Sequence, residues 1–162
     1  MLDLGTFTAV RTILSLVAIV SGLGAVAAFF WPATHPLWTS TFLVTAMLTS
    51  VTGFFFPFEG LLPSHILLGA IAVVVLAAVL AARYPFALRG IWRAVYAGGM
   101  VASEYLLVFV LVTQAFDKVP ALNALARTQS EPLFAVAQLV VLVVFGYIGF
   151  PATRRFRAAP AH

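Results

Sequence analysis

Five long apolar stretches, separated by short polar breaks, constrain this chain more than any other feature. They cover residues 12–31, 37–56, 65–82, 94–116 and 133–150. A helix of about 20 apolar residues, rising about 1.5 Å per residue, crosses the roughly 30 Å of hydrocarbon in a bilayer. Each stretch meets that length or comes close to it, so the sequence predicts five transmembrane helices.

The composition excludes a soluble globular protein. Of the 162 residues, 63% are hydrophobic and 9% are charged, and the mean hydropathy is +1.09. A soluble domain has about 25% charged residues, because its surface must be solvated. We therefore expect an all-α integral membrane bundle, with one transmembrane domain over residues 1–157 and a disordered tail over 158–162.

The second stretch is the weakest of the five because it contains seven threonine and serine residues between Thr39 and Thr52. Such hydroxyls bond to the preceding helical turn and are tolerated in lipid. We therefore keep this stretch as a predicted span.

Arginine and lysine positions predict the orientation. One side of the membrane would hold Arg83, Arg89, Arg93, Arg154, Arg155 and Arg157, and the other would hold Arg11, Lys118 and Arg127. Basic residues gather on the cytoplasmic side, so we expect a cytoplasmic C-terminus and an external N-terminus. The net charge of +4 then reflects membrane orientation and not nucleic-acid binding.

A polar segment over residues 117–131 would form an external loop that carries Asp117, Lys118, Arg127 and Glu131. Within it, residues 120–126 predict a short helix along the membrane interface. This loop is one predicted contact surface for a partner protein.

The first stretch also fits a signal peptide, because residues 13–27 end in the small-x-small pattern Ala25-Val26-Ala27. Cleavage would leave four spans and would turn Arg83, Arg89 and Arg93 outward, against the positive-inside rule. An uncleaved helix is therefore the favoured interpretation.

Small residues at helical spacing predict where the helices pack. Lipid is as apolar as leucine, so helix association depends on close backbone approach and shared hydrogen bonds. One stripe lies on the first stretch and one on the fourth: Ala18, Gly22 and Ala25, and Ala94, Gly98 and Ala102. We expect packing contacts there, within the bundle or with a protein partner or a second copy of the chain, rather than a pore lining.

Glu104 is the residue least suited to its predicted surroundings. It falls near the middle of the fourth stretch, where an ionised carboxylate costs about 2.5 to 3.5 kcal/mol. Helical spacing puts it on a face with Met100 and Leu107, away from the stripe of Gly98. Either another helix covers this face, or the carboxyl is protonated and neutral.

The candidate intramembrane polar site consists of Glu104, Tyr105, Gln114 and Gln138. No lysine or arginine lies at the predicted depth of Glu104, so its partner would be Ser103, Tyr105, Gln138 or a group on another subunit. Gln114 and Gln138 would bond to each other or to helix backbones. Glu104 is then a neutral structural carboxyl, or a carboxylate that handles protons or ions.

No cofactor, metal or catalytic group is expected. His35 and His65 flank the second stretch and would lie about 30 Å apart, so one haem cannot use both. The chain has no cysteine. The sequence also lacks metal-ligand spacing, a glycine-rich phosphate loop and a nucleophile–base pair.

The following short segments of the sequence carry a family resemblance: residues 49–54 with 56–58, 63–65, 82–84, 92–93 with Tyr96, 114–116 with 118–122, and 128–132. They resemble a family of small bacterial multi-pass integral membrane proteins without assigned function, over about residues 38–157. The resemblance implies a bacterial inner-membrane protein and brings no activity with it. Relatives have asparagine at the position of Leu107, an apolar residue at Glu104, and proline at Arg127 and Leu133, which implies that Glu104 is a local replacement.

The sequence therefore predicts a non-enzymatic accessory or assembly component within the bilayer. The alternative is a small transporter or channel subunit whose polar path uses Glu104, Gln114, Gln138 and the hydroxyls of the second stretch. A haem- or quinone-binding redox protein is the third hypothesis.

Overall fold

The computed structural model describes residues 4–31, 37–54, 63–125 and 132–158, and all the regular structure in these residues is helical. In chain order the helices are α1 (Leu4–Ala27), α2 (Leu37–Phe54), α3 (Pro63–Arg83), α4 (Trp92–Lys118), α5 (Pro120–Leu125) and α6 (Pro132–Ala158). In lipid only helices and closed barrels satisfy every backbone hydrogen bond. The predicted all-α class is confirmed for these residues.

Four helices contain a segment that is long and apolar enough to cross a membrane: Ala9–Ala27, Ile66–Arg83, Trp92–Thr113 and Pro132–Arg155. The described residues thus indicate a membrane protein with four candidate spans, where the sequence predicted five. The fifth prediction corresponds to α2, whose apolar part, Leu37–Thr52, is too short for a full span by the same measure. Residues 55–56, which would extend it, lie outside the described residues.

Prolines mark the beginning of three helices, since α3, α5 and α6 start at Pro63, Pro120 and Pro132. Proline loses no intrahelical bond at the first helical position, and its φ is already set for a helix. α6 also contains Pro151 and continues to Ala158, beyond the predicted end at Phe150. The rest of the expected tail, residues 159–162, lies outside the described residues.

The predicted polar loop is partly helical. Asp117 and Lys118 belong to the last turn of α4, and α5 confirms the short helix expected in this segment. The break comes at Val119, which is extended (φ −86°, ψ 116°) because a residue before proline is driven out of the helical region. Arg127 and Glu131 lie outside the described residues.

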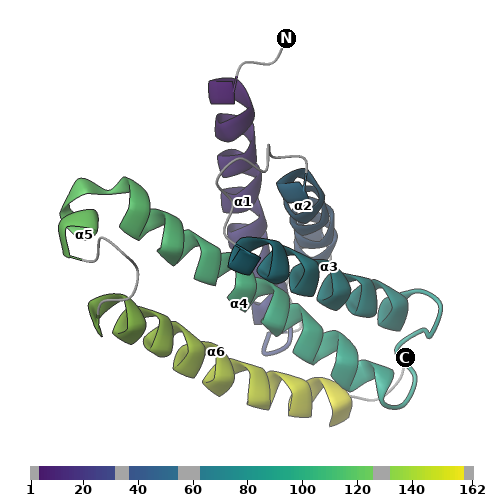
Figure 1. Ribbon diagram of the computed structural model, residues 1–162. Helices are drawn as coiled ribbons and strands as arrows, with labels where there is room; N and C mark the ends of the chain where they lie inside the picture. Colours follow the sequence, from purple (N-terminus) through teal and green to yellow (C-terminus); the bar gives the residue numbers. More distant parts are fainter. Residues whose placement is uncertain (1–3, 32–36, 55–62, 126–131, 159–162) are drawn as a thin grey trace.

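α4 is the central helix of the bundle and contacts α1, α3, α5 and α6. Figure 1 shows the axes of α3, α4 and α6 roughly aligned, with α4 running opposite to the other two, and α1 and α2 side by side at an angle to them. One apolar cluster joins α1, α2, α3 and α4 around Phe42 and Met100, and a second joins α1, α4 and α6 around Val101 and Phe145. α4 takes part in both clusters and therefore positions residues toward both sides of the bundle.

α4 and α6 run antiparallel in a constant register. Phe116 meets Phe134 edge-on, with ring centroids 5.4 Å apart, at one end. Tyr105 and Phe145 follow at 6.0 Å. The side chains that face α6 from α4 are thereby fixed over most of its length.

Candidate functional site

Glu104 lies within α4 with an exposed fraction of 0%. Its side chain faces Gly22 of α1, where a methyl group would overlap a carboxylate oxygen and lie 2.7 Å from the Glu104 Cδ. The ring of Phe42, from α2, closes the same place, with Cδ2 2.8 Å from that methyl position. Another helix therefore covers this face of α4, which is one of the two arrangements expected from the sequence.

Neither carboxylate oxygen of Glu104 has a hydrogen-bond partner among the described residues, and the same holds for the buried hydroxyls of Ser103 and Thr49. The nearby Ser21 hydroxyl donates to the carbonyl oxygens of Val17 and Ala18, 2.7 and 3.1 Å away, in its own helix. Burial has thus removed water from the Glu104 carboxyl without supplying a donor. Ser103, one of the partners predicted for Glu104, therefore makes no hydrogen bond to it.

Gln138, on α6, is bonded to α4 at a different level. Its Nε2 donates to the Phe109 carbonyl oxygen at 3.2 Å and to the Thr113 Oγ1 at 3.3 Å. Thr113 lies nine residues beyond Glu104, which is about 13 Å along the helix axis. The backbone of α4 is therefore one of the partners that the sequence predicted for Gln138. Gln138 and Glu104 are separated along α4 and are not partners of each other.

Tyr105 and Gln114, the other two members of the predicted polar site, also belong to α4. The ring of Tyr105 packs beside Phe109 and Phe145, with centroid distances of 6.1 and 6.0 Å, and so it belongs to the contact with α6. Gln114 lies in α4, one residue beyond Thr113. Among the side chains that the structure describes, Glu104 is the member of the predicted polar site that α1 and α2 enclose.

The small-residue stripe of α1 lies inside the bundle. Ala18, Gly22 and Ala25 are all buried, and Gly22 lies against the Glu104 carboxyl. The absence of a side chain at Gly22 makes room for the carboxyl. This stripe is therefore used within the chain and leaves no surface for a partner.

The stripe of α4 makes looser contacts. Ala94, Gly98 and Ala102 are half-buried, and a methyl group on Gly98 would lie 3.9 Å from the Thr153 Oγ1 of α6, an ordinary contact. The closer approach is at Gly99, which sequence reasoning passed over. A methyl group there would overlap the Val79 side chain of α3.

Arginines gather at one end of the bundle, which we call the arginine end and define by Arg83, Arg89, Arg93, Arg154 and Arg155. Two sets of contacts join these arginines to the residues that follow α1. The Arg83 Nη1 donates to the Tyr96 hydroxyl at 2.8 Å, and the Tyr96 ring meets Phe29 edge-on at 6.1 Å. The Arg155 guanidinium lies 5.3 Å from the centroid of the Phe30 ring. Arginines of α3 and α6 thus lie at one end of the bundle.

The connection between α3 and α4 is a defined turn at this end. Ala87 and Leu88 adopt left-handed backbone conformations, with φ of 48° and 55°, and Gly90 has φ 55°. For residues other than glycine this conformation costs about 1 to 2 kcal/mol each. Stacking of Phe86 on Trp92, 4.0 Å between centroids, accompanies the turn. Pro85 and Gly90 are the sequence signals for this connection.

No group of three or more histidine, cysteine, aspartate or glutamate residues is placed to hold a metal ion in the part of the chain that the structure describes. His65 lies in the first turn of α3. His35 and His162 lie outside the described residues. Comparisons of the chain with protein-family models, with curated proteins and with solved structures found no match.

Proposed function

We propose that this chain is a non-enzymatic multi-pass membrane protein that serves as an accessory or assembly component within the bilayer. The separation of its buried polar groups is the observation that carries this proposal. Glu104 faces Gly22, whereas Gln138 is bonded at Thr113, about 13 Å further along α4. A polar path for an ion or proton needs neighbouring groups that can pass it on, and these two are not neighbours.

In this proposal Glu104 is a neutral structural carboxyl. An ionised carboxylate that is buried without a partner costs several kcal/mol, and no hydrogen-bond donor reaches Glu104 among the described residues. The protonated form avoids most of that cost. The Glu104 carboxyl then stabilises the fold through packing, because it fills the space beside Phe42 that the missing side chain of Gly22 leaves open.

The proposed topology has five spans, an external N-terminus and a cytoplasmic C-terminus in a bacterial inner membrane. α2 supports the fifth span because it runs beside α1, where a methyl group on Gly24 would lie 2.6 Å from the Trp38 ring. The arginine end supports the orientation, since basic residues gather on the cytoplasmic side. The bacterial inner membrane follows from the resemblance of residues 38–157.

The outer flank of α6 is the surface that we assign to a protein partner, because the stripe of α1 is buried in the bundle. α6 contacts the bundle mainly through α4. Its opposite flank carries large exposed side chains: Val136, Val140, Val143 and Tyr147. Tyr147 is 81% exposed, and aromatic residues are enriched at protein interfaces.

The test is extraction of the protein from its native membrane under mild conditions, followed by measurement of the mass and composition of the particle. We expect a second protein in stoichiometric amount. A Val143→Trp variant should lose this protein, whereas Val74→Trp, which alters an equally exposed valine on α3, should keep it. A chain that is recovered alone, as monomer or homo-oligomer, contradicts the proposal.

A small transporter or channel subunit is the second candidate, and it is favoured by the buried ionisable group itself. Carboxylates inside membranes are rare and commonly mark ion or proton pathways, and both oxygens of Glu104 lack a hydrogen-bond partner among the described residues. Proteoliposomes with the Glu104→Gln variant test this role. A pH-dependent flux that the variant abolishes, with the fold intact, supports transport, and an unchanged flux removes Glu104 from it.

A further inference from the structure

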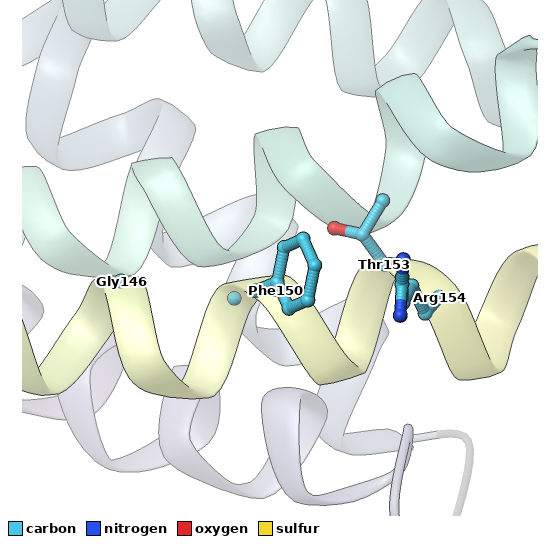
Figure 2. A pocket seen from close by; sticks show the side chains of 5 residues that line it. Gly146, Phe150, Thr153 and Arg154 are labelled. Carbon is cyan, nitrogen blue, oxygen red and sulfur yellow. The ribbon is translucent and has the colours of Figure 1, made fainter.

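A groove of about 500 Å³ lies along the C-terminal part of α6, beside α4. It is lined by Gly146, Gly149, Phe150, Thr153 and Arg154. Figure 2 shows Thr153 between the two helices, with Phe150 and Arg154 next to it on α6. The volume lies within the roughly 300 to 1,000 Å³ that is usual for ligand sites.

All five lining residues belong to α6, and its two glycines differ in their surroundings. A methyl group on Gly149 would lie 3.1 Å from the Val101 Cγ1, so α4 and α6 are in close contact there. A methyl group on Gly146 would have no neighbour within 4 Å. Phe150, which is 65% exposed, forms an apolar wall beside this space.

Arg154 places a positive charge at one end of this groove. The Arg154 guanidinium lies 4.6 Å from the centroid of the Phe150 ring, and Arg155 follows it in the arginine end. Residues 60–103 and 132–162, which contain the five arginines of this end, include no aspartate or glutamate. An occupant of the groove would therefore meet the Arg154 guanidinium at one end and apolar surface along the rest.

We propose that this groove binds one anionic phospholipid. The phosphate would accept hydrogen bonds from the Arg154 guanidinium, and one acyl chain would lie over Gly146 and Gly149 against Phe150. Guanidinium groups suit phosphate because they donate two parallel bonds, and basic pockets between membrane helices bind anionic head groups. The inference rests on the proposed membrane placement and not on the accessory role.

A second copy of the chain fits the groove less well than a lipid does. In a symmetric dimer the same surface faces itself, so the arginine end of one copy would approach that of the other. Like charges across an interface are unfavourable. A phospholipid supplies both the negative charge and the apolar chain that the groove presents.

Native mass spectrometry of the detergent-purified full chain tests the proposal, with phosphatidylglycerol and a phosphatidylcholine of the same acyl chains as probes. The unaltered chain should bind phosphatidylglycerol about fivefold or more tightly than phosphatidylcholine, the scale of one basic group near a lipid head group. Arg154→Gln should weaken phosphatidylglycerol binding about fivefold. Arg89→Gln removes the same charge from an exposed arginine of this end that does not line the groove, and it should leave the binding unchanged.

A second pair of variants tests the apolar part of the groove. Gly146→Leu fills the open space without a clash and should reduce binding of both lipids, whereas Ala135→Leu, at an exposed position near the other end of α6, should not.

Three results would overturn the proposal: equal binding of the two lipids, equal effects of Arg154→Gln and Arg89→Gln, or a dimer that Gly146→Leu dissociates while lipid binding stays the same. A chain that remains soluble without detergent would instead refute the membrane placement, before any lipid is added.

Discussion

Replacing Gly22 with alanine tests the contact that encloses Glu104. The added methyl group would overlap a carboxylate oxygen, lie 2.7 Å from the Glu104 Cδ and lie 2.8 Å from the Phe42 ring. The carboxyl is the flexible end of its side chain, yet both it and Phe42 are fully buried, which leaves little room for either to move. The variant should therefore strain the contact between α1, α2 and α4.

The magnitude follows from comparison with a second glycine. Overpacking a tight core costs about 1 to 3 kcal/mol, and glycine to alanine in a helix gains up to about 1 kcal/mol from propensity. Gly146→Ala gains the same propensity with no neighbour within 4 Å of the new methyl group. We therefore expect Gly22→Ala to be less stable than Gly146→Ala by about 1 to 3 kcal/mol.

The free energy of unfolding can be measured by titration with sodium dodecyl sulfate in mixed micelles, followed by circular dichroism. A double variant identifies the group that clashes. In a Glu104→Ala background the carboxyl no longer occupies the place of the methyl group, and only the contact with Phe42 remains. The cost of Gly22→Ala should then fall by about 1 kcal/mol, a coupling typical of residues in direct contact.

Equal stability of Gly22→Ala and Gly146→Ala would refute the contact between Gly22 and Glu104. A cost that is the same with and without the Glu104 side chain would assign the strain to Phe42 alone. In that case the structural role that we propose for the carboxyl would be wrong, because its shape would not matter to the packing of α1.

Three further substitutions test other contacts by the same titration. Gln138→Leu should change stability by less than about 1 kcal/mol, since hydrogen bonds between membrane helices average about 0.6 kcal/mol and the buried amide oxygen has no partner among the described residues. Gly99→Ala should cost about 1 to 3 kcal/mol by overpacking, and Val79→Ala in the same chain should relieve it. Tyr96→Phe should cost about 0.5 to 1.5 kcal/mol because Arg83 loses its hydroxyl acceptor, and a stability equal to the unaltered chain would contradict that bond.

The sequence predicted helices well wherever local chemistry decides. Hydropathy and proline positions place α3 and α6, because a proline at the first helical position and a long apolar run are both local signals. Helical periodicity also puts Glu104 on the face of Met100, which is as buried as the carboxyl. The sequence of α4 alone was thus enough to predict which face of the helix carries Glu104 together with buried apolar residues.

The neighbour across that face was not predictable, since a periodic pattern on one helix carries no information about which helix lies opposite. Gly98 and Gly99 illustrate this limit. Gly98 belongs to the regular stripe, but the closest approach is at Gly99, about 100° around the helix, because Val79 of α3 stands there. Ala87 and Leu88 in left-handed conformations are a second example, because neither residue type favours that conformation.

α4 presents different chemistry on two of its faces, and the proposals made above concern different faces. Toward α1 it presents Glu104 in a space closed by Gly22 and Phe42, where no described donor reaches the carboxyl. A closed site of this kind can hold helices together, but exchange of an ion or substrate would require α1 to move away. Toward α6 it packs along most of its length, and a groove on the C-terminal part of α6 ends beside Arg154. A lipid can reach this groove without any rearrangement, so Arg154→Gln and Gly146→Leu should affect lipid binding, whereas Gly22→Ala should affect stability.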